Sequence, residues 1–114
     1  MRIHYLEIVC SDADAQCAAL EQVHGVSFGS PVADLGNARI AEVSDGSLIG
    51  VRVPLAEHEQ PIVRNYYEVD DIAKAVEEAE AAGGVIAFGP TRIGDTGNWA
   101  IYFFDGIQLG LWQR

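Results

Sequence analysis

The sequence has few basic residues and no long apolar run. Seven Lys and Arg residues against seventeen Asp and Glu residues give a formal net charge of −10, which would repel the phosphates of nucleic acid, so nucleic-acid binding is not expected. The longest apolar runs, at residues 85–88 and 99–104, are far below the roughly 18 residues that span a bilayer, so no membrane segment is expected. Glu7 interrupts the first apolar stretch and excludes the shape of a cleavable signal peptide, which leaves a cytoplasmic location as the expectation.

The chain is also poor in cysteine. Cys10 and Cys17 are its two cysteines, and in a reducing compartment such a pair is more often two free thiols than a disulfide. With 114 residues, 49% of them hydrophobic, the chain can bury a core without a disulfide or a structural metal. The composition therefore predicts one folded, soluble domain.

The first half of the chain reads as one strand, one helix and several short strands. Apolar residues at 3–9 are typical of a strand, and Ser11-Asp12 then supplies a capping signal for an Ala-rich helix over 13–23. His24-Gly25 marks the end of that helix. Three predicted strands follow, near residues 26–28, 38–43 and 47–53, and turn-forming Gly, Asn, Pro and Asp-Gly residues separate them.

The second half repeats this order after a linker. Two prolines bracket the polar residues 54–61, which predicts an exposed connection. A strand over 62–69, a cap at Asp70-Asp71 and a helix over 72–82 follow, and three more strands complete the unit. A shift of sixty residues places Asp45-Gly46 on Asp105-Gly106, as an internal duplication would. We predict an α+β fold of two βαβββ modules, residues 1–53 and 62–114, joined by the linker 54–61.

Three motifs give this doubled unit a resemblance to a known family. They are Val-Asp-Asp-Ile at 69–72, Gly-Asn-Trp-Ala-Ile-Tyr-Phe-Phe-Asp-Gly at 97–106 and Gly-Leu-Trp-Gln at 110–113. Together with the repeat, they make essentially the whole chain similar to the vicinal oxygen chelate superfamily, which includes glyoxalases, bleomycin-resistance proteins and extradiol dioxygenases. The resemblance implies curled mixed sheets around a central cavity. We also expect a homodimer, because a second copy would cover sheet edges that each half leaves open.

The resemblance further implies where a metal ion would bind. In the family's metal enzymes, the first and last strands of each module supply ligands, commonly His and Glu. The corresponding positions here are His4 and Arg64 on the first strands, and Gly50 and Gly110 on the last strands. Glycine has no ligating side chain and a guanidinium stays protonated, so three of the four positions cannot bind a cation. One histidine does not hold a divalent ion tightly, so we expect neither a metal nor a cofactor.

Other residues do not obviously replace this ligand set. Glu7 and Glu68 lie three and four residues beyond the first-strand positions, so at least one of them points to the opposite strand face. His24 is expected at a helix end and His58 in the linker, while the facing of Glu42 stays open.

The family's ligand positions define a candidate pocket instead. Aromatic rings with the same strand parity suit a flat or apolar ligand, and Arg64 can form a bidentate contact with a carboxylate or phosphate. The two glycines are expected to leave room for the ligand. Structural roles are the alternative for each residue: ion pairing for Arg52 and Arg64, packing for Tyr66 and Trp112. The predicted ligand-binding residues are His4, Leu48, Gly50, Arg52, Arg64, Tyr66, Gln108, Gly110 and Trp112.

Three functions follow as hypotheses. The first is a metal-independent protein that binds a small aromatic or anionic metabolite in the cavity. The second is an enzyme, a lyase, isomerase or dioxygenase with an altered metal site around His4, or a metal-free enzyme that uses His4 for proton transfer. The third is a structural or partner-binding module. The sequence identifies no catalytic residue with a clear partner, which favours the first hypothesis.

Overall fold

The chain forms two compact units, and the boundary between them differs from the predicted linker. The computed structural model describes all residues, 1–114, and its units are Tyr5–Val63 on the one hand and Met1–His4 with Arg64–Arg114 on the other. We call them the first and second units. The start of the first strand therefore belongs to the second unit. No helix in either unit has the length and apolar character needed to cross a membrane.

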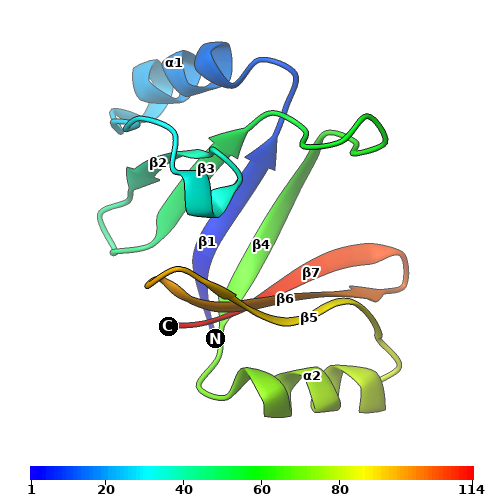
Figure 1. Cartoon of the computed structure of the whole chain (residues 1–114). Helices are drawn as coiled ribbons and strands as arrows, with labels where there is room; N and C mark the ends of the chain where they lie inside the picture. The colour runs from blue at the N-terminus through cyan, green and yellow to red at the C-terminus, as the bar shows by residue number, and fades with distance from the viewer. The chain divides into compact units, whose positions relative to one another are not determined.

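The first unit is a three-stranded sheet with one helix (Figure 1). Its strand order is β2-β3-β1, in which β3 runs parallel to β1 and antiparallel to β2. A short 3-10 turn precedes β2. The elements are β1 (Arg2–Val9), α1 (Ala13–His24), η1 (Ala33–Leu35), β2 (Arg39–Glu42) and β3 (Leu48–Arg52).

The predicted strand at residues 26–28 is not formed. The Phe28 amide donates to the Glu21 carboxylate on α1 at 2.9 Å, and this bond takes the place of one in a strand ladder. The neighbouring Gly29 amide bonds to the Ile40 carbonyl of β2, also at 2.9 Å. The first module thus has three strands, where the predicted unit has four.

The second unit shows the predicted βαβββ order, except that the first two residues of β4 belong to the first unit. Its strand order is β4-β7-β6-β5, and α2 lies along one face of this sheet (Figure 1). Asp105 and Gly106 adopt φ angles of 52° and 76°, the left-handed conformation that a two-residue hairpin turn between β6 and β7 requires. The elements are β4 (Ile62–Glu68), α2 (Ile72–Ala81), β5 (Val85–Ile93), β6 (Gly97–Phe104) and β7 (Ile107–Gln113).

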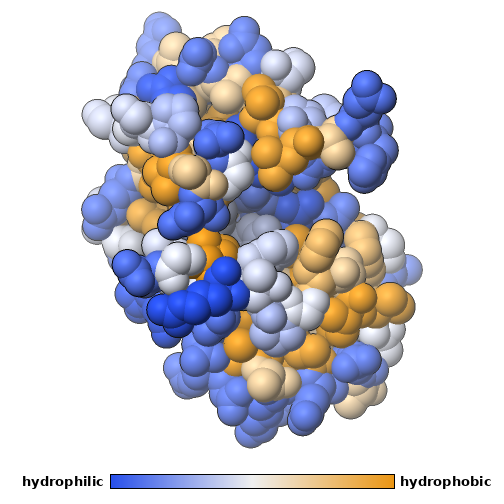
Figure 2. Space-filling view, in the orientation of Figure 1, coloured by the Kyte–Doolittle hydropathy of each residue, from blue (hydrophilic) through white to orange (hydrophobic).

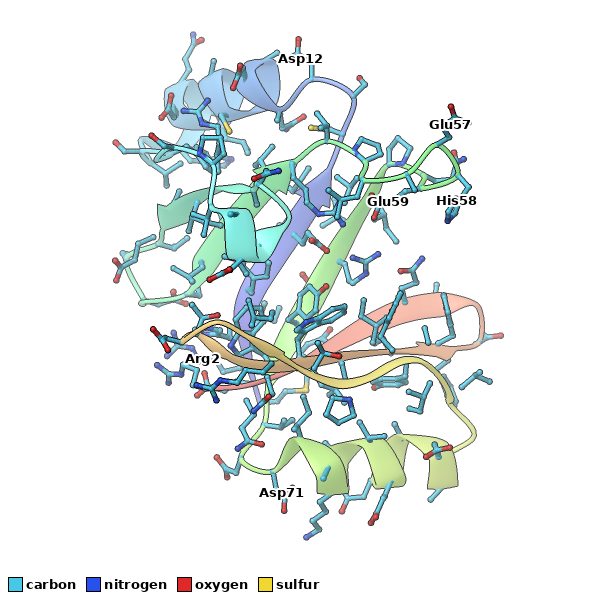
Figure 3. All side chains as sticks on the ribbon, viewed as in Figure 1. Arg2, Asp12, Glu57, His58, Glu59 and Asp71 are labelled. Carbon is cyan, nitrogen blue, oxygen red and sulfur yellow. The ribbon has the colours of Figure 1, made fainter.

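Both helices begin at the predicted aspartates. The Asp12 carboxylate accepts the Ala15 amide at 3.0 Å, and the Asp71 carboxylate accepts the Lys74 amide at 3.1 Å. Each bond satisfies one of the amides that an N-terminal helical turn leaves without a partner. Figure 3 shows Asp12 and Asp71 at the starts of α1 and α2. The equivalent caps support the duplication that the sequence indicates.

Each helix buries one face of its own sheet. Cys17 of α1 is fully buried in a cluster with Phe28, Ala41 and Val51. In the second unit, Ile72 of α2 packs with Ala100 and Leu111. Because alternate strand residues point to opposite faces, the neighbours of these core residues project from the face without a helix.

The cap at Asp71 provides a test of the second unit. We expect Asp71→Ala to lower the free energy of unfolding by about 1 kcal/mol, because the Lys74 amide loses its acceptor. Asp70→Ala is the matched control, since Asp70 is exposed beside the cap. Urea unfolding followed by circular dichroism measures both variants. An equal loss in the two variants would contradict the role of this cap.

Candidate ligand-binding site

One face of the second unit's sheet carries an aromatic cluster. Residues paired across neighbouring strands share a face, and the register pairs Tyr66 with Gly110 and Trp99 with Trp112. The α2-covered face carries Ala100 and Leu111, which are one residue out of phase. We call the opposite side the aromatic face; the register places on it Arg64, Tyr66, Phe88, Trp99, Ile101, Phe103, Gln108, Gly110 and Trp112.

The aromatic rings on this face form a continuous series. Tyr66 packs edge-on against Trp112, with ring centroids 5.8 Å apart, and against Trp99 at 6.3 Å. Phe88 lies 5.5 Å from Trp99 at an interplanar angle of 41°. These separations are typical of favourable aromatic pairs. Burial decreases along the series, from Trp112 at 1% exposed through Tyr66 at 4% to Phe88 at 57%.

Arg64 and Gln108 add a polar group to the aromatic face. Gln108 Oε1 accepts from Arg64 Nε at 3.0 Å and from Arg64 Nη2 at 2.7 Å, so one amide oxygen fixes the plane of the guanidinium. Arg64 Nη1 also lies 3.5 Å from the Tyr66 hydroxyl oxygen. The sequence placed Arg64, Tyr66, Gln108, Gly110 and Trp112 together, and the second unit brings all five to one face.

The two glycines do not leave the open room that the sequence suggested. A Cβ at Gly110 would lie 2.4 Å from the Tyr66 ring, and a Cβ at Gly50 would fall inside the Tyr5 side chain. In both units a tyrosine therefore occupies the space that a larger residue at the glycine would need. The glycines allow a ring to lie against the strand, which corrects the expectation of an open cavity floor.

In the first unit, Arg52 binds two carboxylates. Its Nε donates to Glu7 at 2.9 Å, while its Nη1 and Nη2 both donate to Glu59 at 2.8 Å. The bonds to Glu59 and Glu7 raise the pKa of Arg52. Glu59 also accepts the Leu55 amide, so it holds the linker onto β3. Leu48, Gly50 and Arg52 project from the same face of β3. Because the guanidinium of Arg52 is bound to Glu59 of the linker, we assign Arg52 a structural role.

His4 does not lie on the same strand face as Gly50. The register pairs Glu7 with Gly50 and Tyr5 with Leu48, so Tyr5 and Glu7 occupy that face. His4 is one residue out of phase, because the sixty-residue shift is off by one at this strand. The first-module counterpart of Arg64 is therefore Tyr5, which corrects the predicted equivalence of His4 with Arg64.

His4 instead belongs to a charged cluster in the second unit. Its ring lies 5.3 Å from that of Trp112, and its Nδ1 is 3.8 Å from Glu68 Oε2. Neither of these two buried atoms has a hydrogen-bond partner. The other carboxylate oxygen of Glu68 accepts from Arg114 at 2.7 Å, and this bond is the main reason that the pKa of Glu68 is lowered. Burial lowers the pKa of His4; Arg114 and Arg2 lower it further, and Glu68 opposes them.

The residues present do not fit the family's metal ion. Gly110 and Gly50 carry no donor atom, and tyrosine rings lie where a ligating side chain would start. Arg64 is a cation. Within neither unit do three His, Cys, Asp or Glu side chains come together as a ligand group. His24 ends α1, and Figure 3 shows His58 at the outer end of the linker, as the sequence predicted.

Two rings of the aromatic series, Trp99 and Phe88, were not identified from the sequence. Trp99 and Phe88 lie on β6 and β5, whose facing depends on the register of the sheet. A signal for Trp99 was present, because a two-residue turn at Asp105-Gly106 pairs residue 104 with 107 and so pairs Trp99 with Trp112. Phe88 had no such signal, since register shifts occur on both sides of it.

The contact between Gly110 and Tyr66 predicts a steric cost. We expect Gly110→Ala to lower the free energy of unfolding by roughly 1–3 kcal/mol, the usual range for overpacking, because the new methyl group overlaps the ring. Gly89→Ala is the control, since nothing lies within 4 Å of the Cβ it would add. Urea unfolding compares the two variants. A Gly110→Ala protein as stable as Gly89→Ala would show that Tyr66 moves away easily.

The lowered pKa of His4 predicts a pH dependence. The unfolded state takes up a proton near pH 6.5 but the folded state resists it, so His4 makes stability fall as the pH drops through and below that value. We expect the unfolding free energy of the wild type to decrease between pH 7.5 and pH 5.5, and that of His4→Gln to decrease less. His58→Gln, which changes an exposed linker residue, should keep the wild-type slope. Equal slopes in all three proteins would contradict this.

Comparisons with known proteins identify the fold. No protein-family model and no curated protein sequence matches the chain. Among solved structures, a hypothetical protein from Bacillus halodurans C-125 aligns with a TM-score of 0.77 at 13% identity, over 99% of this chain and 94% of that one. Methylmalonyl-CoA epimerase from Mycobacterium tuberculosis aligns with a TM-score of 0.73 at 14% identity, over 97% of this chain and 86% of the epimerase.

A third solved structure agrees with these two. A variant of the Streptomyces coelicolor methylmalonyl-CoA epimerase, in complex with 2-nitronate-propionyl-CoA, gives a TM-score of 0.71 at 16% identity, with 99% of this chain and 94% of the epimerase covered. Identities this low establish the fold and do not carry an activity across. The chain thus has the glyoxalase/bleomycin-resistance fold that its repeat and its motifs predict.

Proposed function

We propose that this chain is a metal-independent small-molecule-binding protein whose ligand lies on the aromatic face of the second unit. The observation that carries the proposal is the series of four rings, Trp112, Tyr66, Trp99 and Phe88, on the same face as the Arg64–Gln108 pair. Aromatic lining with a small number of placed polar groups is the usual composition of a small-molecule site. Three of the four residues at the family's metal positions support metal independence, because Gly50 and Gly110 have no side-chain donor and Arg64 is itself a cation.

Arg64 indicates an anionic group on the ligand. Its guanidinium is held in a fixed plane by Gln108, and a planar cation with a fixed orientation favours a carboxylate or phosphate over a neutral group. The rings next to it favour a flat, apolar remainder. The proposed ligand is therefore an aromatic or otherwise flat metabolite that carries an acid group.

A second candidate function is proton transfer by His4. His4 Nδ1 and Glu68 Oε2 are buried, 3.8 Å apart and without hydrogen-bond partners. The lowered pKa of His4 favours the neutral imidazole, the form that accepts a proton. We rank this function second because a general base needs a hydrogen-bonded partner that orients it, and His4 Nδ1 has none. Two of the solved structures that share the fold are epimerases, which are enzymes, and this likeness favours the second candidate.

Calorimetric titration tests the first proposal. We expect 1-naphthoate to bind the full chain and its neutral amide to bind at least about tenfold more weakly, as the loss of a charge-assisted hydrogen bond implies. Binding should be unchanged after treatment with EDTA. No binding of 1-naphthoate, or binding that requires an added divalent metal, would overturn the proposal.

Two arginine variants locate the anionic group. Arg64→Gln should weaken 1-naphthoate binding by about tenfold or more, and Arg64→Lys should restore part of it. Arg92→Gln is the matched control, because Arg92 pairs with Asn98 and so projects from the opposite face of the same sheet. Circular dichroism verifies that each variant is folded. Equal effects of Arg64→Gln and Arg92→Gln would indicate only a general charge effect.

The proposed site lies within one unit and needs no second copy. The homodimer therefore stays a prediction, to be tested by light scattering on the full chain.

A further inference from the structure

The exposed end of the aromatic face has an unusual backbone. β5 pairs with β6 through Ile86 and Tyr102, then through Phe88 and Ile101, and next through Thr91 and Trp99, with register shifts between these pairs. Such irregularities turn a side chain away from the direction that a regular strand would give it, and they occur often beside binding sites. Phe88 lies between the two shifts. The irregular strand thus sets where Phe88 stands on the aromatic face.

Phe88 and Trp99 together form a partly exposed pair of rings. Phe88 is 57% exposed, Trp99 is half-buried, and their centroids are 5.5 Å apart. Figure 2 shows that the surface over β5, β6 and β7 is partly apolar. Two adjacent, partly exposed rings offer apolar area that a flat ligand would bury. The other rings of the series, Tyr66 and Trp112, are nearly fully buried and offer little area to a ligand.

We infer that Phe88 and Trp99 form a stacking ledge for the flat part of the ligand and so determine its preference for planar over non-planar acids. This inference rests on the proposed function, since Arg64 on the same face binds the acid group in that proposal. Trp99 is the fixed member, because its ring is supported by Tyr66 at 6.3 Å. Phe88 is the outer member, which covers the ligand from the edge strand.

The chain offers a matched control for Phe88. Phe104 is also an exposed phenylalanine of the second unit, at 47%, but it projects from the opposite face, where its ring lies 3.8 Å from the Cβ position of Gly83. Phe88→Ala and Phe104→Ala therefore remove the same exposed side chain from two faces of one sheet. General effects on solubility or stability should be similar in both variants.

Calorimetry of the full chain with two acids tests the ledge. 1-Naphthoate is flat, whereas cyclohexanecarboxylate has the same charge but a puckered ring. We expect Phe88→Ala to weaken 1-naphthoate binding by roughly 3- to 10-fold, the range of one aromatic pair, and to leave cyclohexanecarboxylate binding within about twofold. Trp99→Leu should show the same selectivity, and Phe104→Ala should bind both acids like the wild type.

The outcomes separate this inference from the proposed function. If the wild type and Phe88→Ala bind 1-naphthoate equally, the ledge is overturned while the binding function stands. If Phe88→Ala weakens both acids by the same factor, Phe88 has no role in planar selectivity and the ledge is again overturned. If the wild type binds neither acid, the proposed function and the ledge both fail. A weakened, selective response of Phe88→Ala and Trp99→Leu alone supports the inference.

Discussion

Within each unit, a tyrosine ring packs against a glycine of the last strand, and the side chains on that sheet face depend on this contact. At Gly110 the missing side chain lets the Tyr66 ring lie against the backbone, and from there Tyr66 supports Trp112 and Trp99. A larger residue at 110 would displace the ring and with it the aromatic series. In the first unit Gly50 also accommodates a tyrosine ring, but this is Tyr5, which occupies the position equivalent to Arg64 and not that of Tyr66. The missing side chains at these two glycines therefore permit the packing of both tyrosine rings.

Arg52 of the first module and Arg64 of the second module have different hydrogen-bond partners. Arg52 binds Glu7 and Glu59 and fixes the connection that follows β3. Arg64 is oriented by Gln108, whose amide oxygen accepts from its Nε and Nη2. Arg52 thus holds the linker, whereas the guanidinium of Arg64 lies on the aromatic face of the second unit.

Much of the fold could be predicted from local signals. Asp12 and Asp71 mark the helix starts, and the second Asp-Gly turn fixes the β6–β7 register. The face shared by Arg64, Gln108 and Trp112 followed from the two-residue period of a strand. His4 was assigned to the wrong strand face because an error of one residue in the repeat shift moves a side chain to the opposite face. Phe88 was missed because its facing depends on tertiary pairing, and residues 26–28 failed to form a strand because a side chain on α1 took a backbone amide.

The bond between Arg52 and Glu59 limits how the connection between the modules can vary in length. Glu59 reaches back to Arg52 and to the Leu55 amide, so the residues from 53 to 59 form a closed loop with a fixed span. Loops on a protein surface normally tolerate insertions. An insertion before Glu59 would move the carboxylate away and leave a buried guanidinium with one partner fewer, whereas an insertion at Gln60 would keep the loop intact. Variation in linker length is thus permitted at one end of the connection and opposed at the other.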